Sequence, residues 1–414
     1  MIEQQQLTTI PFVSQEKLYP QSVDEFLSSL GHLVDLNVEK GMRLDFILEN
    51  GLRNGKLSPV LKLANIEDAG EIASICKEVY QGTYPYKEME DEKAVRQMIK
   101  DPKHHFLLFK VGSNKNAGCF RCVLDFENKK GYMGGFMIRK EYQGVVDVVK
   151  TIVGAYIWMW NKFKNDIFVW HCENRTAHAV SQYITAVCGI HTVAILPNKD
   201  VFFDEIESDV LGVIYSNKAL KTLRSTEIPV LVPEALGCFL YSDELFNLGP
   251  FKISNLDPIL DSFVVSRLAS KLTTIVNDMG FGYEKITFLF ADSNSFFSFL
   301  YTKQIQNFEK VEYEVNSLEE LYVFLQEFKK IARDLDVRYC EAFVSAYKPE
   351  YQKLFLNHGF SPRGYVPCWN CNKISNMFED YIVFNYYKGQ IKDIKLLPEG
   401  FKLLELLGIN DQII

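Results

Sequence analysis

The sequence has 414 residues, of which 47% are hydrophobic and 24% charged, which is enough apolar material for two domains with full cores. Its net charge of −8, without a run of Lys or Arg, disfavours nucleic acid and favours small molecules or proteins as partners. The N-terminus lacks a basic stretch followed by an apolar core, so we expect no signal peptide. The longest apolar candidate, 145–160, is interrupted by Asp147 and Lys150, so we expect no membrane span and a cytoplasmic protein.

The nine cysteines are scattered, which is typical of free buried thiols in a reducing compartment. Two Cys-x-x-Cys pairs, Cys119/Cys122 and Cys368/Cys371, raise the alternative of a structural zinc. Cys119 and Cys122 lie in a strand-like run, where residues three apart point to opposite faces. We therefore expect buried thiols and no metal.

Residues 1–58 are predicted to form a small N-terminal helical cap without chemistry of its own. Ser22 followed by Glu25 is a capping-box pattern that predicts the start of a helix, and a second helical pattern covers 38–52. Such a cap could cover a substrate entrance or a partner surface.

From residue 60 the pattern changes to short strands alternating with helices. Three consecutive strands joined by tight turns indicate an antiparallel meander, and the polar stretch 198–207 is predicted to be a loop. The predicted strands are 60–63, 106–111, 119–126, 132–138, 167–171, 191–195 and 210–215, and the predicted helices begin at Asn65, Asp91, Val145 and Asn174.

The strand 132–138, the polar turn 139–144 and the helix 145–163 follow one another directly. This order places free backbone N–H groups and the positive end of a helix dipole at one point. Such a point is suited to an anion, typically a phosphate.

This segment resembles motif A of the GNAT (Gcn5-related) N-acetyltransferases, with Gln143-Gly144 at the start of the pyrophosphate loop and Val146 and Val148 in place of the usual small residues. Asn174, Ala177 and Gly189-Ile190 resemble motif B of the same family. The resemblance covers about 60 to 215 and implies that the strands before the two motif helices splay apart around the pantetheine arm. Gly134-Gly135 could carry the bulge that a splay needs.

The chain is predicted to repeat this pattern after a connecting segment, 217–255, that contains three prolines. The second copy, 256–414, has predicted helices at 258–279, 317–335 and 349–357. Glu319 and Glu320 lie in the first turn of its motif A helix and would repel a pyrophosphate. We therefore predict a mixed α/β protein with two GNAT-like domains, 59–216 and a degenerate copy at 256–414, each a mostly antiparallel mixed sheet flanked by helices.

The resemblance also implies roles for individual residues. The amide of Met137 or Ile138 would polarise the thioester carbonyl, Tyr183 would be the acid, and Glu173 with His171 would supply the base. Each has a simpler alternative: Tyr183 could be an ordinary core or surface tyrosine, and His171 a buried histidine held by a hydrogen bond. Asp125 and Glu127 are the other carboxylates near the motif A strand. The residues expected at the cofactor are Met137, Ile138, Gln143, Gly144, Val145, Val146 and Asn174.

Two further groups have less specific readings. Tyr80, Tyr84 and Tyr86 fall where the family's acceptor site lies, or they simply pack together. His104-His105 is expected at the surface.

The predicted function is transfer of an acyl group from acetyl-CoA, or another acyl-CoA, to the amine of a small molecule, with the C-terminal copy completing the acceptor site or a homodimer interface. A non-catalytic tandem binding or scaffold protein, and a transferase that uses a larger activated donor, are the alternatives.

Overall fold

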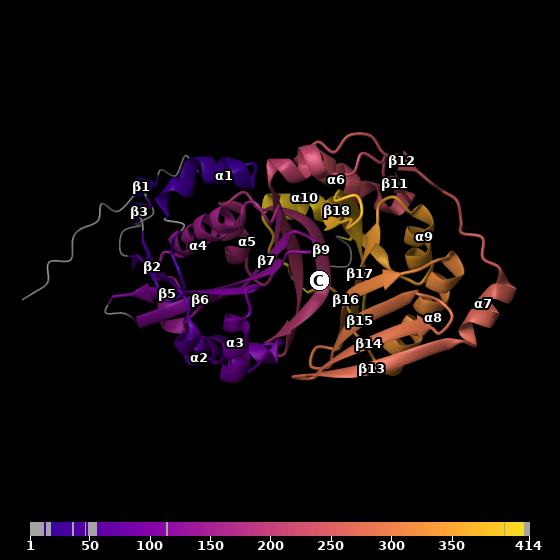
Figure 1. Cartoon of the computed structure of the whole chain (residues 1–414), viewed down its shortest axis with the longest axis horizontal. Helices are drawn as coiled ribbons and strands as arrows, with labels where there is room; N and C mark the ends of the chain where they lie inside the picture. The colour runs from indigo at the N-terminus through magenta and orange to yellow at the C-terminus, as the bar shows by residue number, and fades with distance from the viewer. Residues whose placement is uncertain are drawn as a thin grey trace, which may run out of the picture. The chain divides into compact units, whose positions relative to one another are not determined.

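The computed structural model describes residues 12–13, 18–34, 37–45, 47–48, 56–112, 115–392 and 394–409. The chain divides into two compact units: unit 1 comprises 1–173, 180–191 and 212–219, and unit 2 comprises 174–179, 192–211 and 220–414. Each unit combines a mixed sheet with helices (Figure 1), so the predicted α/β class is confirmed. The domain division at 59–216 and 256–414 stays a prediction.

The sheet of unit 1 has the strand order β2-β4-β5-β6-β7-β8. Neighbouring strands from β2 to β7 are antiparallel, which includes the predicted three-strand meander from β5 to β7, and β8 runs parallel to β7. The strands are β2 (Arg43–Leu44), β4 (Val60–Leu63), β5 (His104–Val111), β6 (Lys115–Asp125), β7 (Lys130–Ile138) and β8 (Val169–Arg175).

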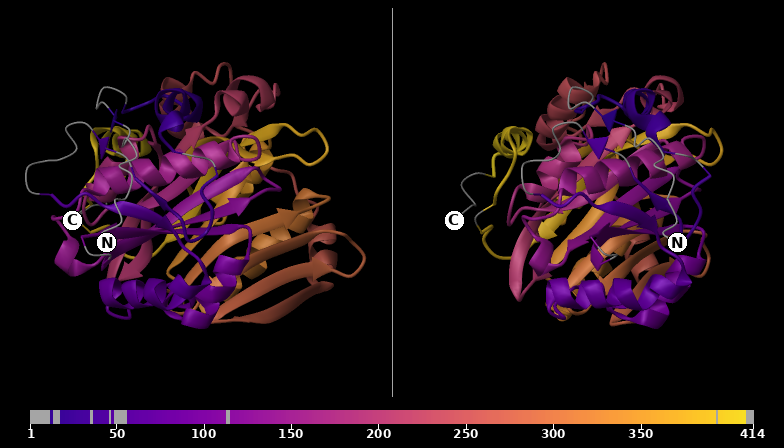
Figure 2. Two further views of the ribbon diagram at one scale, coloured as in Figure 1. Left: turned by 60° about the vertical axis from the view of Figure 1, so that its left-hand side comes forward. Right: turned by 90° about the vertical axis from the view of Figure 1, so that its left-hand side faces the viewer.

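Helices cover both faces of this sheet. Helix α4 (Val148–Phe163) lies on one face, and α2 (Ala69–Tyr80) and α3 (Glu92–Lys100) lie on the other (Figure 2). Trp158 and Trp160 of α4 are almost fully buried in the core, and α5 (Val180–Ala186) packs against α4. Along the described chain, no helix combines the length and the apolar character that crossing a membrane requires.

The N-terminal segment is only partly helical. The capping box predicted the start of α1 (Val23–Leu30) correctly: Ser22 Oγ accepts from Glu25 N, and α1 packs on α4 through Phe26 and Trp160, whose ring centroids lie 4.7 Å apart. The helix predicted over 38–52 is wrong where the structure describes it. Strand β2 pairs with β4 instead, and β3 (Ile47–Leu48) pairs with β1 (Phe12–Val13), so pairing across the sheet overrides the local helical pattern. Residues 46 and 49–52 lie outside the described residues.

The expected surface position of His104 and His105 is also wrong. The His105 ring packs against Trp158 and Phe163, with ring centroids 5.5 and 5.0 Å away. Burial, followed by the charge of nearby Lys40, lowers the pKa of His105 to about 4. Burial likewise lowers the pKa of His104 to about 4.

These histidines predict a stability loss in mild acid. Between about pH 6.5 and pH 4 the unfolded chain binds protons that the folded chain does not, so the free energy of unfolding falls as the pH drops through this range. Replacing His105 with Phe should make the loss between pH 7 and pH 5 smaller by about 1–2 kcal/mol, as measured by urea unfolding. The exposed His178→Asn variant is the control, and an unchanged slope for His105→Phe would contradict the assignment.

The sheet of unit 2 has the strand order β13-β14-β15-β16-β17-β19-β18-β9. All neighbours are antiparallel except β16 and β17, which are parallel. The strands are β9 (His191–Phe202), β13 (Leu272–Gly280), β14 (Tyr283–Phe290), β15 (Phe296–Thr302), β16 (Asn307–Glu314), β17 (Tyr339–Ser345), β18 (Ser361–Cys371) and β19 (Phe378–Tyr387).

Two predicted elements of unit 2 are corrected. The helix expected over 258–279 is a short helix, α7 (Ser262–Ala269), followed by β13, because the β-branched run 273–276 favours a strand. The expected loop 198–207 belongs to a hairpin of β9 and β10 (Glu205–Tyr215). Its two turn residues, Phe203 and Asp204, both have positive φ, as a type I′ turn requires.

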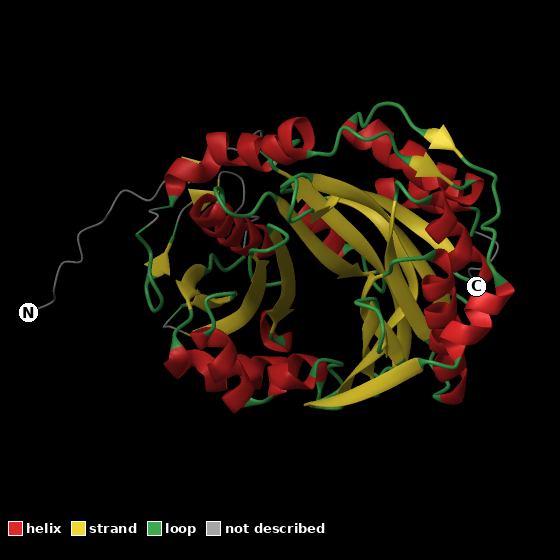
Figure 3. Cartoon of the chain, turned by 45° about the vertical axis from the view of Figure 1, so that its right-hand side comes forward, coloured by secondary structure: helices red, strands yellow, loops and turns green. Residues whose placement is uncertain are grey.

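Helices α8 (Leu318–Asp334) and α9 (Pro349–Asn357) contact one another and lie along one side of the unit 2 strands (Figure 3). Helix α6 (Leu236–Phe246) packs on β18 and on α10 (Pro398–Leu407). A tight turn at Gly280–Gly282 joins β13 directly to β14, whereas α2 and α3 stand between β4 and β5 in unit 1.

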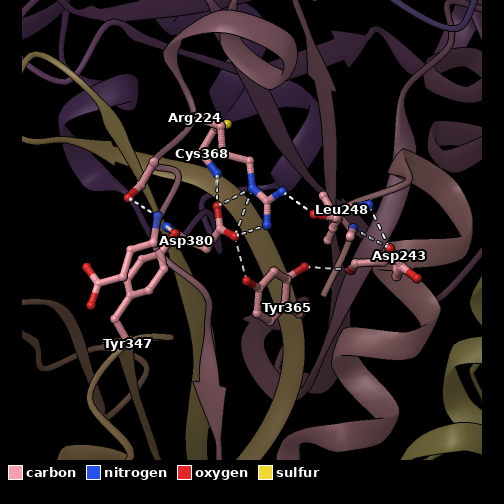
Figure 4. Close-up of polar contacts among 11 residues, drawn as sticks. Arg224, Asp243, Leu248, Tyr347, Tyr365, Cys368 and Asp380 are labelled. Carbon is pink, nitrogen blue, oxygen red and sulfur yellow. Dashed lines mark hydrogen bonds and ion pairs between the residues drawn. The ribbon is translucent and has the colours of Figure 1, made fainter. Parts of the chain in front are cut away.

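A buried polar network fixes the interior of unit 2 (Figure 4). The Asp380 side chain is fully buried and accepts from the Arg224 guanidinium at 2.6–3.1 Å, from Tyr365 Oη at 2.5 Å and from Cys368 N at 3.0 Å. Arg224 also donates to Leu248 O at 2.6 Å. Burial opposes the charge of Arg224, but the hydrogen bonds and charge of Asp380 raise the pKa of this guanidinium above its usual value.

Candidate functional site

The candidate site begins where β7 and β8 separate. The structure describes both strands along their whole length and pairs them at three positions only, Lys130–Tyr132 with Val169–His171. The remaining residues of β7, Met133 to Ile138, therefore run without β8 as a partner. A gap opens between the two parallel strands, toward their C-terminal ends, as the resemblance implied.

A bulge in β7 accompanies the separation. The register between β6 and β7 shifts between Cys119 and Arg121, and Gly135 on the opposite strand has φ +60°. A Cβ atom at Gly134 would lie 2.6 Å from the Tyr132 ring, so the ring of Tyr132 covers Gly134. The two glycines thus permit both the positive φ and the close approach of a side chain.

The backbone directions at the end of β7 distinguish Ile138 from Met137. Arg139 N donates to Ala117 O on β6, and Ile138 lies opposite Gly118. Because successive residues of a strand direct their N–H groups to opposite edges, the N–H of Ile138 faces away from β6, into the gap. The N–H of Met137 faces β6 and is not available there.

His171 and Glu173 lie on the same face of β8, since strand side chains alternate. The His171 ring contacts the Tyr132 ring at a centroid distance of 5.3 Å, and both residues of β8 are half-buried. The opposite face of β8 carries Trp170, which packs on α4. Asn174 is buried and belongs to unit 2, so its expected contact with pantetheine stays a prediction.

Most of the backbone amides in the loop before α4 are hydrogen-bonded within the chain. The N–H groups of Val145 and Val146 donate to Tyr142 O, and the N–H of Asp147 donates to Leu57 O. Gln143 Nε2 donates to Ile138 O at 3.1 Å. Gln143, Gly144 and Val145 are exposed, and Gly144 has φ +72° with open space around its Cβ position.

Helix α4 begins at Val148, three residues later than predicted, because Asp147 is its N-cap. The Asp147 carboxylate accepts from Lys150 N at 3.1 Å and is 5% exposed. Burial raises the pKa of Asp147, while the hydrogen bonds to Lys150 N and Val149 N oppose this rise. A carboxylate therefore lies where the resemblance places an anionic pyrophosphate.

Tyr183 lies on α5 with 37% of its side chain exposed. It is hydrogen-bonded to Tyr19, whose own N–H donates to Val187 O at 2.8 Å. Burial and this hydrogen bond raise the pKa of Tyr19. The structure thus places Tyr183 beside the N-terminal segment, and its role as an acid stays a prediction.

The other two carboxylates near the motif A strand, Asp125 and Glu127, lie at the turn between β6 and β7. Asp125 accepts from Glu127 N, Asn128 N and Asn128 Nδ2, and so fixes the turn between β6 and β7. Glu127 is exposed at this turn. Both lie at the end of the hairpin where β7 begins, away from Ile138.

The tyrosines after α2 form an aromatic cluster on the α2–α3 face. Ring centroids lie 4.4 Å apart for Tyr80 and Tyr84, and 5.6 Å apart for Tyr84 and Tyr86. Burial, then the neighbouring Tyr80 and Tyr132, raise the pKa of Tyr84, and Arg121 opposes this rise. Arg121 and Tyr132 flank the bulge, and nothing in the sequence marks them as part of this cluster, because only the strand register brings them to it.

Unit 2 contains a second separation of parallel strands. The structure pairs β16 with β17 at Asn307–Phe308 and Tyr339–Cys340, and Lys310 at the adjacent register shift has φ +53°. An ion pair of the chain itself lies at the start of the unpaired part of β17: the carboxylate of Glu341, the first residue beyond the paired positions, binds Lys199 Nζ at 3.0 and 3.2 Å, and both residues are buried.

The start of α8 is also occupied. Ser317 Oγ accepts from Glu320 N at 3.3 Å, and Glu320 Oε2 accepts from Asn316 N at 2.7 Å. Glu319 Oε1 accepts from Asp261 N at 3.2 Å. Glu320 N, an amide of the first turn of α8, is thus taken up by the Ser317 cap, and the two carboxylates place negative charge at this end of the helix.

Comparison with known proteins gives likenesses of fold only. Spermidine N-acetyltransferases from Vibrio cholerae resemble part of the chain: a SpeG mutant (13% identity, 38% of this chain and 94% of that chain, TM-score 0.33), the enzyme in complex with CoA and spermine (12%, 38% and 95%, 0.33) and SpeG with manganese ions (13%, 38% and 92%, 0.32). No protein-family model and no curated protein matches the chain.

Proposed function

We propose that unit 1 transfers an acyl group, acetyl in the simplest case, from a coenzyme A thioester to the amine of a small molecule. The observation that carries this proposal is the separation of β7 from β8 after Tyr132, with the Ile138 N–H directed into the gap. A thioester arm in this gap would present its carbonyl oxygen to that N–H, which would stabilise the negative charge formed on attack. The Gln143-Gly144 and Asn174 motifs support the same reading.

In this proposal, different residues of the chain accept and donate the protons that the reaction moves. The amine attacks the thioester carbon and loses a proton to Glu173 or His171, on the same face of β8 beside the gap. The tetrahedral species collapses by breaking the carbon–sulfur bond, and the leaving thiolate takes a proton from Tyr183. Ile138, rather than Met137, supplies the polarising amide, because the N–H of Met137 faces β6.

The proposal assigns no cofactor to unit 2, which we read as a degenerate second copy. A buried Lys199–Glu341 ion pair lies where β17 leaves its pairing with β16, and Glu320 lies at the start of α8. A ligand that displaced one member of the ion pair would leave the other as a buried charge without its partner, which is costly. Unit 2 would then serve as part of the acceptor site or a homodimer interface.

Calorimetric titration of the full chain with acetyl-CoA and with acetyl-pantetheine tests the donor. We expect micromolar binding of both donors, because the gap holds the pantetheine arm that they share. Failure of both donors to bind would overturn the proposed function. If neither acetyl-CoA nor acetyl-pantetheine binds but a larger activated acyl group binds tightly, the larger-donor alternative is established.

The Asp147→Asn variant should bind acetyl-CoA about 3–10-fold more tightly than the wild type, because asparagine caps a helix as well as aspartate but carries no charge to repel the pyrophosphate. Binding of acetyl-pantetheine, which lacks the pyrophosphate, should not change. Calorimetry measures both constants. Equal effects on the two donors, or none on acetyl-CoA, would show that the pyrophosphate does not approach α4.

A second candidate is a non-catalytic binding protein. It is favoured by the amides of Val145, Val146 and Asp147, which are hydrogen-bonded within the chain and so are withdrawn from a phosphate. Under this reading the gap binds no thioester, and the same titrations would show no binding of either donor.

A further inference from the structure

Arg121 of β6 is half-buried and lies opposite Gly134 at the bulge of β7. Its hydrogen bond in the described chain runs from Nη1 to the sulfur of Met98 at 3.9 Å, and sulfur is a weak acceptor. No carboxylate or carbonyl oxygen of the described residues accepts from its guanidinium.

The other buried and half-buried arginines in the described ranges all donate to oxygen atoms. Arg139 and Arg224 bind carboxylates, and Arg338 donates to Lys199 O, Ile305 O and Asn307 Oδ1. Arg175 binds Glu207, and Arg363 donates to Asn385 Oδ1. Arg121 departs from this pattern, and because it is only half-buried its guanidinium is free to exchange water for an oxygen acceptor of a ligand.

The surroundings of Arg121 place it on the acceptor side of the candidate site. A Cβ atom at Gly135 would lie 3.3 Å from Arg121 Cβ, so this side chain leaves β6 directly beside the bulge. Its charge lowers the pKa of Tyr84 in the aromatic cluster, whereas the neighbouring Tyr132 raises that pKa. Tyr132 in turn contacts His171. Tyr132 and His171 are thus direct neighbours on β7 and β8, and Arg121 lies on β6 two residues along from the position opposite Tyr132.

We propose that Arg121 binds a carboxylate of the acceptor, so that the substrate is an amine that also carries a carboxylate. The identification of this ligand as the acceptor rests on the proposed function. The binding of a carboxylate by Arg121 is independent of that function. Guanidinium and carboxylate match as planar, bidentate partners. Neighbouring strands lie about 4.8 Å apart, and Arg121 is two residues along β6 from Val123, which lies opposite Tyr132, so the Cα atoms of Arg121 and His171 are separated by roughly 12 Å. The two side chains cover part of this distance, and an amine and a carboxylate several bonds apart, as at the two ends of lysine, cover the rest.

Matched pairs of ligands test this proposal. L-lysine and cadaverine differ only by the carboxylate, as do L-ornithine and putrescine, and each is titrated calorimetrically into the full chain without any donor. We expect the wild type to bind the amino acid of a pair at least tenfold more tightly than the diamine. The Arg121→Gln variant should bind the two within about threefold of each other. Arg96→Gln removes an exposed arginine of the same unit that is paired with Glu92, and should keep the wild-type preference.

A structural role for Arg121 predicts a different result. Loss of an arginine that holds the fold lowers the melting temperature, whereas loss of one that lacks an oxygen acceptor should leave it unchanged or raise it. Equal binding within both pairs, no binding of either amino acid, or an unchanged preference in Arg121→Gln would overturn the proposal. These titrations contain no donor, so they test Arg121 independently of the proposed function. If binding depends on the carboxylate but acetyl-CoA does not bind, the proposed function is overturned and the carboxylate site at Arg121 stands.

Discussion

Replacing Asp380 with alanine should lower the free energy of unfolding by about 3–5 kcal/mol, because it leaves the Arg224 charge in the interior without its partner. Asp380 is fully buried and accepts hydrogen bonds from Arg224, Tyr365 Oη and the backbone of Cys368. The substitution therefore removes several acceptors at once. Urea unfolding followed by circular dichroism measures the change.

A double-mutant cycle separates the ion pair from the rest of this network. Arg224→Met alone leaves a buried carboxylate, so it should also be costly, but the two substitutions together should cost less than the sum of the single losses. A loss below about 1 kcal/mol for Asp380→Ala would mean that water reaches the site and that the network does not stabilise unit 2.

Replacing Glu173 with glutamine should lower kcat by roughly 10²–10⁴-fold if Glu173 takes the proton of the attacking amine, because glutamine keeps the shape but cannot accept that proton. The affinity for acetyl-CoA should not change, because the donor is held by the gap and not by this side chain. Steady-state kinetics with the acceptor that supports turnover, together with calorimetry of the donor, gives both quantities.

The choice between the two candidate bases follows from parallel variants. If the imidazole of His171 is the base, His171→Asn should lower kcat more than Glu173→Gln does. Glu173→Gln would then act mainly by changing the orientation of the imidazole. The exposed Glu127→Gln, at the turn between β6 and β7, is the matched control and should retain full activity. Full activity of both Glu173→Gln and His171→Asn would exclude this face of β8 from the chemistry.

The sequence predicted those features whose cause is local. The Gly134-Gly135 pair predicted the bulge because glycine tolerates the positive φ that a bulge requires. The Ser22 and Glu25 capping box predicted the start of α1 for the same kind of reason. Asp147 is also a preferred N-cap residue, so the late start of α4 could have been recognised from the sequence.

Other features depend on distant parts of the chain. The type I′ turn at Phe203-Asp204 has a phenylalanine at a position that favours glycine or asparagine, so it gives little sign of a hairpin. The apolar residues of α7 and β13 read as one helical stripe, although the β-branched run 273–276 is a local sign of a strand. Arg121 resembles any other strand residue until the register places it beside Gly134 and Tyr84.

The division of the chain between the units has a consequence for how the protein is made. All of unit 1 lies within the first 219 residues, so it can fold as soon as these have left the ribosome. Residues 192–211, which form β9 and the first part of β10, belong to unit 2 and must await the remaining chain, including β18, whose Gly364 lies opposite Ala194. During that interval the strand residues within 192–211 lack their partner β18, and unpaired strand residues are the kind of surface on which nascent chains pair wrongly and chaperones act.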